Sequence, residues 1–260
     1  MRICCAQISQ VYEDIDTAFS RAEEYIASAN ADMVIFCEQY ATGWRSAASS
    51  ADAEAVKNRW LSLAKQYRVC LVGSYQKPAG DKPQNVMLVC SPEGEVIAEY
   101  AKVHLFTPGG EDAAFSAGSA PVCFEFGGMK FGCAVCFESQ TVQTPARINR
   151  ELFREYLKEG AHCVIVQAAW PAARAADWEL LLRARALENR GYVIGCSCIG
   201  YDDSTGTDYC GRSMVCNFEG RIIEDAGVFE GGAEWELDAA DAVSGVSDMR
   251  KKWGLEALTM

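Results

Sequence analysis

The strongest constraint on the fold is the alternation of short apolar runs with longer stretches of helical period along nearly the whole chain. The runs are rich in β-branched residues, as buried strands are, and the longer stretches repeat apolar residues every three or four positions, as amphipathic helices do. No Pro/Ser-rich linker, internal repeat or low-complexity tract divides this pattern. We therefore expect a single α/β domain that spans residues 1–260.

The order of the expected elements narrows the architecture. A helix begins behind Asp14, and the other helices are expected at Ala53–Tyr67, Arg150–Glu159 and Ala175–Asn189. Strands are expected at Arg2–Ile8, Met33–Cys37, Val69–Tyr75, Val86–Cys90, Val96–Tyr100, Pro121–Phe126, Lys130–Cys136, Cys163–Gln167, Tyr192–Ile199, Ser213–Asn217 and Arg221–Glu224. So many strands need helices over both sheet faces, which indicates a layered α/β sandwich. Two stacked sheets flanked by helices fit this pattern, and so does one large doubly wound sheet.

Charge and hydropathy exclude several classes of partner. The formal net charge of −12 would repel a phosphate backbone, and no Lys/Arg cluster forms a local basic face, so we expect no nucleic acid partner. No apolar run approaches the roughly 18 to 20 residues of a membrane span, and Met1–Gln7 lacks the apolar stretch of a signal peptide. We expect a cytoplasmic protein without a membrane partner.

The 13 cysteines are an odd number, and most lie inside apolar runs, where a reduced thiol behaves as a small hydrophobe. Cys136 differs because it closes the run Phe131–Val135 and polar residues follow closely. It lies where a strand opens into a loop, and reacting side chains of α/β folds gather beyond strand ends. Cys136 is therefore a candidate nucleophile, with one more buried core thiol as the alternative.

A nucleophilic cysteine needs a base or a nearby cation, because its thiol is mostly protonated at neutral pH. His104 offers a papain-like pair, whereas His162 leads into a strand from the helix side. Glu38 and Lys102 offer another route, since each directly follows an expected strand. Either residue alone also fits an ordinary charged residue of a surface loop.

Cys133 and Cys136 form a C-x-x-C pair, which invites a redox or zinc interpretation. Along an extended strand, three steps of about 3.3 Å separate the two Cα atoms by roughly 10 Å, and a disulfide needs about 4.4 to 6.8 Å. No other Cys/His spacing resembles a metal site. We expect no metal and no organic cofactor.

Three segments at strand ends together resemble the nitrilase superfamily of carbon-nitrogen hydrolases, whose members present a glutamate, a lysine and a cysteine in this order. The segments are Phe36–Trp44 around Glu38, Tyr100–Phe106 around Lys102, and Gly132–Glu138 around Cys136. The similarity extends to Gly109–Asp112, Ala168–Pro171, Arg183–Asn189 and Gly211–Met214. Within the superfamily, the sequence most resembles the omega-amidase-like branch, especially over Trp178–Gly200.

The resemblance implies a four-layer α-β-β-α sandwich, usually paired into a homodimer, and a catalytic centre. Glu38 would take the thiol proton and later activate water, and Cys136 would attack the carbonyl to give a thioester. Lys102 and the Phe137 backbone N–H would stabilise the oxyanion, while Glu111 would help to hold the lysine and the substrate. Between two carboxylates the lysine would stay protonated, and its charge would favour the thiolate.

Three aromatic residues and one pair of charged residues are candidates for roles outside the catalytic centre. Tyr40, Phe137 and Trp170 are candidate walls of the substrate pocket, and Trp170 fits the core equally well. Arg185 and Glu188 lie one turn apart in an expected helix, where structural ion pairing or a dimer contact is favoured over catalysis.

The sequence also departs from the family after the nucleophile. Many relatives carry an arginine there, which could clamp a substrate carboxylate, and this chain has Ser139-Gln140 instead. A carboxylate-bearing substrate therefore lacks an evident partner, unless Arg147 replaces it.

The predicted reaction is hydrolysis of a small amide, with release of ammonia. Hydrolysis of a carbamoyl compound, which also releases carbon dioxide, and acyl transfer to an amine use the same machinery and stay open. A non-catalytic binding protein that keeps the fold is the alternative from another class. Burial of Glu38, Lys102 and Glu111 without a function would be costly, which favours the enzyme.

Overall fold

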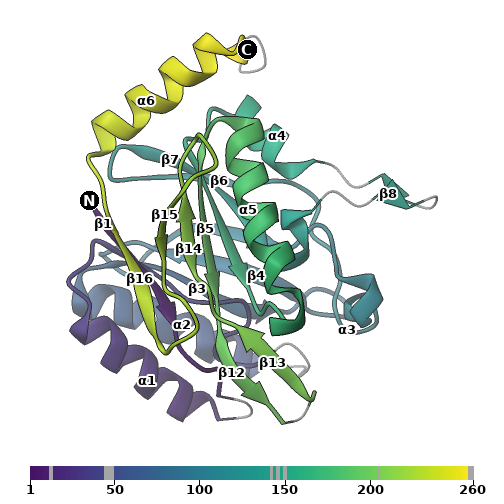
Figure 1. Ribbon diagram of the computed structural model, residues 1–260. Coiled ribbons are helices and arrows are strands. Elements are labelled where there is room, and N and C mark those ends of the chain that lie inside the picture. The colour runs from purple at the N-terminus through teal and green to yellow at the C-terminus, as the bar shows by residue number, and fades with distance from the viewer. Residues whose placement is uncertain are drawn as a thin grey trace.

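The computed structural model describes residues 1–11, 14–43, 50–140, 143–144, 147–148, 151–203 and 205–256. At its centre lie two six-stranded sheets (Figure 1). The first sheet has the order β16-β1-β2-β3-β4-β5. Its strands are β1 (Arg2–Gln7), β2 (Met33–Ile35), β3 (Cys70–Lys77), β4 (Gln84–Cys90), β5 (Val96–Ala101) and β16 (Gly231–Glu236).

The second sheet has the order β15-β14-β11-β10-β7-β6. Its strands are β6 (Cys123–Phe126), β7 (Met129–Val135), β10 (Cys163–Ala168), β11 (Tyr192–Ser197), β14 (Met214–Cys216) and β15 (Ile222–Asp225). Each sheet has three parallel strands at its centre, β1-β2-β3 in the first and β7-β10-β11 in the second, and antiparallel strands outside them. Parallel strands are normally buried on both faces, which agrees with their continuous apolar runs.

The strands of the first sheet show why both faces need cover. Ile3 and Cys5 of β1 belong to the apolar core that the first sheet shares with the second. Cys4 and Ala6, which point the other way, belong to a separate core with residues of the two outer helices. These are α1 (Ile15–Ser28) and α2 (Ser50–Tyr67).

The second sheet is covered by α4 (Leu152–Lys158) and α5 (Ala175–Asn189), whose buried residues join the shared core. The result is an α-β-β-α sandwich, so the four-layer prediction is confirmed and the single doubly wound sheet is excluded (Figure 1). Smaller helices are α3 (Glu111–Ala114) and the 3₁₀ turns η1 (Thr107–Gly109), η2 (Cys136–Ser139) and η3 (Ala172–Arg174).

Local chemistry explains several element ends. Asp14 caps α1, because its carboxylate accepts a hydrogen bond from the Thr17 backbone N–H at 2.9 Å. Gly132 lets α4 approach β7, since a Cβ there would lie 2.5 Å from the Tyr156 ring.

Some elements were not predicted. The expected strand Tyr192–Ile199 ends at Ser197, and a hairpin of β12 (Ile199–Asp202) and β13 (Thr207–Cys210) follows. Strand β16 and helix α6 (Ala239–Lys252) were also missed, as were the short strands β8 (Gln143–Thr144) and β9 (Arg147–Ile148). Glycines and alternating charges weaken the apolar signal of β16, which is a strand because its backbone pairs antiparallel with β1. The start of the expected helix at Arg150 and the Trp44 end of the first matching segment lie outside the described residues.

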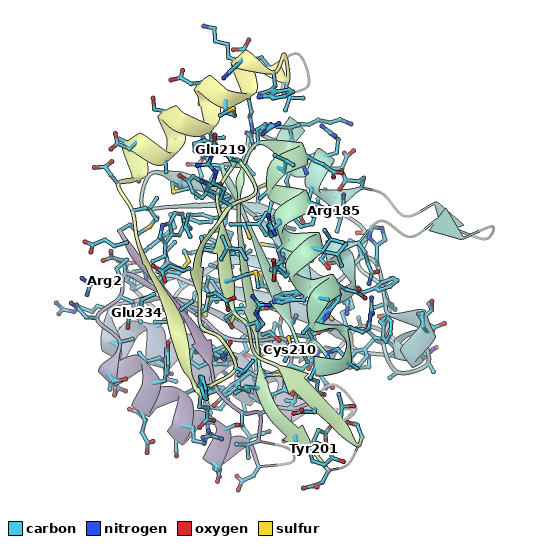
Figure 2. All side chains as sticks on the ribbon, viewed as in Figure 1. Arg2, Arg185, Tyr201, Cys210, Glu219 and Glu234 are labelled. Carbon is cyan, nitrogen blue, oxygen red and sulfur yellow. The ribbon has the colours of Figure 1, made fainter. Side chains whose placement is uncertain are left out.

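All thirteen cysteines are free, and only Cys123 and Cys136 are not fully buried. Figure 2 shows Cys210 at the inner end of the β12–β13 hairpin and Tyr201 toward its outer end. Among the described residues, no helix combines the length and apolar character that crossing a bilayer requires.

Candidate active site

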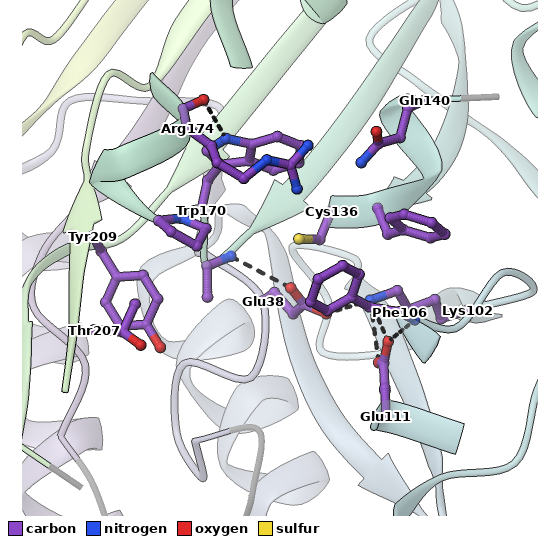
Figure 3. A pocket seen from close by; sticks show the side chains of 13 residues that line it. Glu38, Lys102, Phe106, Glu111, Cys136, Gln140, Trp170, Arg174, Thr207 and Tyr209 are labelled. Atoms are coloured by element: carbon purple, nitrogen blue, oxygen red, sulfur yellow. Dashed lines mark hydrogen bonds and ion pairs between the residues drawn. The ribbon is translucent and has the colours of Figure 1, made fainter. Parts of the chain in front are cut away.

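Three strand ends and one short helix meet around a cavity of about 170 Å³. Glu38 follows β2, Lys102 follows β5, Cys136 follows β7, and Glu111 begins α3 (Figure 3). All four line the cavity, together with Phe106, Phe137, Gln140, Ala169, Trp170, Pro171, Arg174, Thr207 and Tyr209. The fold therefore brings together the four residues that the sequence placed in the catalytic centre.

The nucleophile candidate has an unusual backbone. Cys136 is the first residue of η2 and has a φ of +48°, in the left-handed region that side chains other than glycine rarely adopt. Such a conformation costs on the order of 1–3 kcal/mol and persists where the surrounding structure enforces it. A sharp turn from strand to helix is also how α/β hydrolases expose a nucleophile above the sheet. Here it presents the thiol to the cavity.

Lys102 is almost completely buried and lies between two carboxylates. Its Nζ is 2.9 Å from Glu38 Oε1 and 2.8 Å from Glu111 Oε2. Burial opposes the charged form, but the two carboxylates raise the pKa of Lys102 well above its ordinary value. The lysine therefore stays protonated, as expected, and can stabilise negative charge that develops beside it.

Asn85, which the sequence did not single out, joins the two carboxylates. Its Nδ2 donates to Glu38 Oε1 at 2.8 Å and to Glu111 Oε1 at 3.0 Å. The Phe106 backbone N–H donates to Glu111 Oε2 at 2.6 Å. Burial alone would raise the pKa of Glu111, yet Lys102 and these donors hold it below its ordinary value. Both carboxylates are thus fixed in orientation before a substrate binds.

The surroundings of the Cys136 thiol decide its protonation state. Burial, together with the charges of Glu38 and Glu111 and a hydrogen bond to Glu38, raises the pKa of Cys136 well above its ordinary value. Lys102 acts in the opposite direction, as predicted, but its effect is outweighed. The resting thiol is therefore protonated, and a base must remove its proton during attack. Glu38, which lines the same cavity and acts directly on the pKa of this thiol, is the candidate base.

Glu138 is a second residue that the sequence did not place in the centre. Its buried Oε1 accepts hydrogen bonds from the backbone N–H groups of Val103 and His104, at 2.8 and 2.9 Å. Oε1 also accepts from the Tyr100 hydroxyl at 2.7 Å, and Oε2 accepts from the Val135 N–H at 2.7 Å. Burial raises the pKa of Glu138 to about 7, although these donors lower it. One side chain thus ties the loop after β5 to the turn that carries Cys136.

Replacing Glu138 with glutamine is expected to lower kcat for amide hydrolysis about 10- to 100-fold and the free energy of unfolding by about 1–3 kcal/mol. Every partner of Glu138 is a donor, and the new NH₂ group would face one of them unpaired. Steady-state kinetics and chemical denaturation measure the two effects. Glu125→Gln, a matched change at an exposed position, should alter neither. Equal kcat values and equal free energies of unfolding for the two variants would show that Glu138 does not hold the loop after β5 against the turn of Cys136.

The structure places the three predicted wall residues differently. Phe137 and Trp170 line the cavity. Tyr40 does not: it is fully buried against Phe36, and its hydroxyl donates to the Ala18 carbonyl at 3.0 Å. The prediction for Tyr40 was wrong because the turn after β2 breaks the strand alternation, so that its ring points toward α1 rather than along Glu38.

The remaining predicted residues lie outside the cavity wall. His104 Nδ1 is 3.9 Å from Glu138 Oε1, and His104 does not line the cavity, so the cavity presents no papain-like pair. Arg185 on α5 pairs with Glu188 at 2.9 Å, and its Nε donates to the Ser139 carbonyl at 2.9 Å (Figure 2). Its structural ion pair is confirmed, and it also supports the turn after Cys136.

Seven lining residues were not among the predicted site residues: Phe106, Gln140, Ala169, Pro171, Arg174, Thr207 and Tyr209. Strand β13 of the β12–β13 hairpin contributes Thr207 and Tyr209. No local sequence pattern indicated that this hairpin forms part of the cavity wall. Within the described parts of the chain, no group of three or more His, Cys, Asp or Glu side chains is arranged to hold a metal ion.

The sandwich and its cysteine, glutamate and lysine define a class of hydrolases, and a direct comparison names it. The profile of the carbon-nitrogen hydrolase family matches residues 2–243, so the chain belongs to this family. The predicted resemblance to the nitrilase superfamily is confirmed, and the protein is a hydrolase of carbon–nitrogen bonds.

Individual relatives agree with this assignment. The chain is 29% identical to the 2-oxoglutaramate amidase of Bacillus subtilis (strain 168) over 247 residues, which cover 92% of each chain. It is 30% identical to the omega-amidase YafV of Escherichia coli (strain K12) over 224 residues, 85% of this chain and 82% of the relative. The fold matches an amidase from Nesterenkonia sp. with a TM-score of 0.84 and 24% identity, over 97% of this chain and 96% of that one.

Proposed function

We propose that this protein is an omega-amidase-like enzyme, which hydrolyses a small amide through a thioester on Cys136 and releases ammonia. The observation that carries the proposal is that Cys136 and Glu38 line one cavity, in which the Glu38 carboxylate is paired with the buried Lys102 at 2.9 Å. The names of the two relatives, a 2-oxoglutaramate amidase and an omega-amidase, support the choice of amides.

In the first half-reaction, Glu38 takes the thiol proton while Cys136 Sγ attacks the carbonyl carbon, and the carbonyl π electrons move to oxygen. Lys102 stabilises this oxyanion together with the Phe137 N–H, a role supported by the raised pKa of the lysine. The protonated Glu38 then gives its proton to the amide nitrogen. The C–N bond breaks and ammonia leaves a thioester behind.

In the second half-reaction, Glu38 takes a proton from water, whose oxygen attacks the thioester carbonyl. The C–S bond breaks, the departing sulfur is reprotonated by Glu38, and the carboxylic acid product leaves. Glu111 contacts Lys102 throughout and holds it beside the developing charge. The protonated resting thiol fits this cycle, because the same carboxylate accepts and returns each proton.

The cavity suits a small acyl group. Its volume of about 170 Å³ is below the roughly 300 Å³ at which pockets for drug-sized ligands begin. Phe106, Phe137 and Trp170 supply apolar walls, which exclude water from the reacting carbonyl.

A substrate panel tests the proposal by measuring ammonia and carbon dioxide together. Omega-amides of dicarboxylic acids and simple primary amides should release ammonia alone. Release of both gases in equal amounts from N-carbamoyl amino acids, with no reaction of any amide, would replace the proposal by carbamoyl hydrolysis. With an excess of an amine present, formation of a new amide in place of the acid would show that the amine attacks the thioester and displaces the thiol, which is acyl transfer.

We further propose that the enzyme, as one domain, forms a homodimer in the cytoplasm and takes a small-molecule amide as its partner. Leu180 and Leu187, two turns apart on α5, are both exposed, 67% and 42%, which supports a covered face there. Thirteen free cysteines support a reducing compartment. Sedimentation equilibrium at micromolar concentration would refute the dimer if it gave the mass of one chain.

A further inference from the structure

The cavity holds an arginine at the end of η3, directly before helix α5. The Arg174 guanidinium lies over the ring of Trp170, 4.9 Å from its centroid, and the Trp170 Nε1–H donates to the Arg174 carbonyl at 2.8 Å. Trp170 is almost completely buried, so both the backbone and the head of the arginine rest on a fixed ring. Figure 3 shows the guanidinium above the indole, on the side of the cavity that Gln140 also lines.

The other charges of the cavity gather around the nucleophile. Lys102 pairs with both Glu38 and Glu111, so two carboxylates share one ammonium group there. An anionic group of a substrate is therefore disfavoured at that end. Among the described lining residues, Arg174 is the cation outside this cluster, and α5 adds the positive end of its dipole.

The existing contacts of Arg174 leave it suited to bind an anion. Its Nε donates to Asp177 Oδ2 at 3.0 Å, in a pair that is more than one-third exposed on both sides and hence weak. Asp177 does not line the cavity. A guanidinium carries five N–H groups, and the hydrogen bonds found among the described residues use the Nε–H alone. Its outer edge matches the two oxygens of a carboxylate.

We propose that Arg174 determines the specificity for omega-amides over simple amides, because its guanidinium binds the carboxylate at the far end of the substrate. This inference rests on the proposed function, and it places the amide at Cys136 and the carboxylate at Arg174. Gln140, which lines the cavity close after the nucleophile, is neutral, so it offers a carboxylate no opposite charge there. The small cavity limits the spacer between the two groups to a few carbon atoms.

Kinetics on a matched pair of substrates test this role. Succinamic acid carries the carboxylate, and butyramide has a methyl group in its place. The native enzyme should favour succinamic acid, and Arg174→Met should lower the ratio of the two kcat/KM values about 10- to 100-fold, mainly by raising KM for succinamic acid. Arg174→Lys, which keeps the charge but loses the planar fork, should restore part of the ratio.

Arg183→Met is the matched control, because Arg183 lies on α5, the helix that Arg174 directly precedes, pairs with Glu179 and does not line the cavity. Its ratio should equal that of the native enzyme. A ratio that Arg174→Met leaves unchanged, with both amides still hydrolysed, would overturn the inference and leave the amidase function intact. Native enzyme that hydrolyses neither amide would overturn both.

Discussion

Cys136→Ala is expected to lower kcat for amide hydrolysis by about 10⁵-fold or more, to the background rate. Without the thiol no thioester forms, and the remaining groups have no nucleophile of their own to activate except water. Alanine has the same backbone restrictions as cysteine at a φ of +48°, so the fold should be retained. Ammonia release measured at matched enzyme concentration, with thermal unfolding of both proteins, checks both statements.

Cys123→Ala is the natural control for this change. Cys123 is the other cysteine that is not fully buried, and it does not line the cavity. Its variant should hydrolyse amides at the native rate. Undiminished hydrolysis by Cys136→Ala would show that another group attacks the substrate.

Glu38→Gln is expected to lower kcat by about 10²- to 10⁴-fold, the usual contribution of a general base, and yet to make Cys136 more reactive toward iodoacetamide at neutral pH. Both the charge of Glu38 and its hydrogen bond raise the pKa of the thiol, whereas Lys102 lowers it. Removing the carboxylate therefore lowers the pKa of Cys136 and increases the thiolate fraction. Lys102 keeps Glu111 as a partner, which limits the loss of stability.

The pH dependence of alkylation measures this shift. The midpoint of the alkylation rate at Cys136 should lie at lower pH in Glu38→Gln than in the native enzyme. Mass spectrometry of the Cys136 peptide separates this thiol from the twelve others, and Cys136→Ala provides the blank. Hydrolysis and alkylation that both stay at native values would exclude Glu38 as the base.

These two variants separate the nucleophile from its base. Cys136→Ala loses both hydrolysis and alkylation at this position, whereas Glu38→Gln loses hydrolysis and gains alkylation. The difference arises because the resting thiol is protonated and Glu38 is one of the groups that raise its pKa. A thiol that is already ionised at neutral pH would gain no alkylation rate from the loss of a neighbouring carboxylate.

Much of the fold could be predicted because the relevant signals are local. The sheet centres are buried on both faces, so their strands appear as continuous apolar runs, and α5 was predicted at its observed limits, Ala175–Asn189. Glu38, Lys102 and Cys136 were found by the same signal, as polar or reactive residues directly after such runs. That these three residues lie in one site was predicted from the resemblance to the nitrilase superfamily and not from the periodicity of the sequence.

The errors and omissions have a different origin. Tyr40 is two residues from Glu38 but faces another core, because the turn between them has no fixed alternation. Arg174 and Thr207 line one cavity from elements whose order in the chain says nothing about their proximity. Glu138 shows the same limit, since its partners Val103 and His104 lie 35 and 34 residues away.

The sequence by itself determined the order of the strands and helices from Arg2 to Ser197, apart from α3, β8 and β9, the family and the residue types at the strand ends, because these depend on neighbours along the chain. The tertiary structure decided which polar atoms meet, such as Lys102 and Glu38 across 64 residues. It also decided that the Cys136 thiol rests protonated, and it set Arg174 over the cavity. Charge and burial act through space. The protonation state of the Cys136 thiol and the charges that line the cavity are therefore set only when the two sheets pack together.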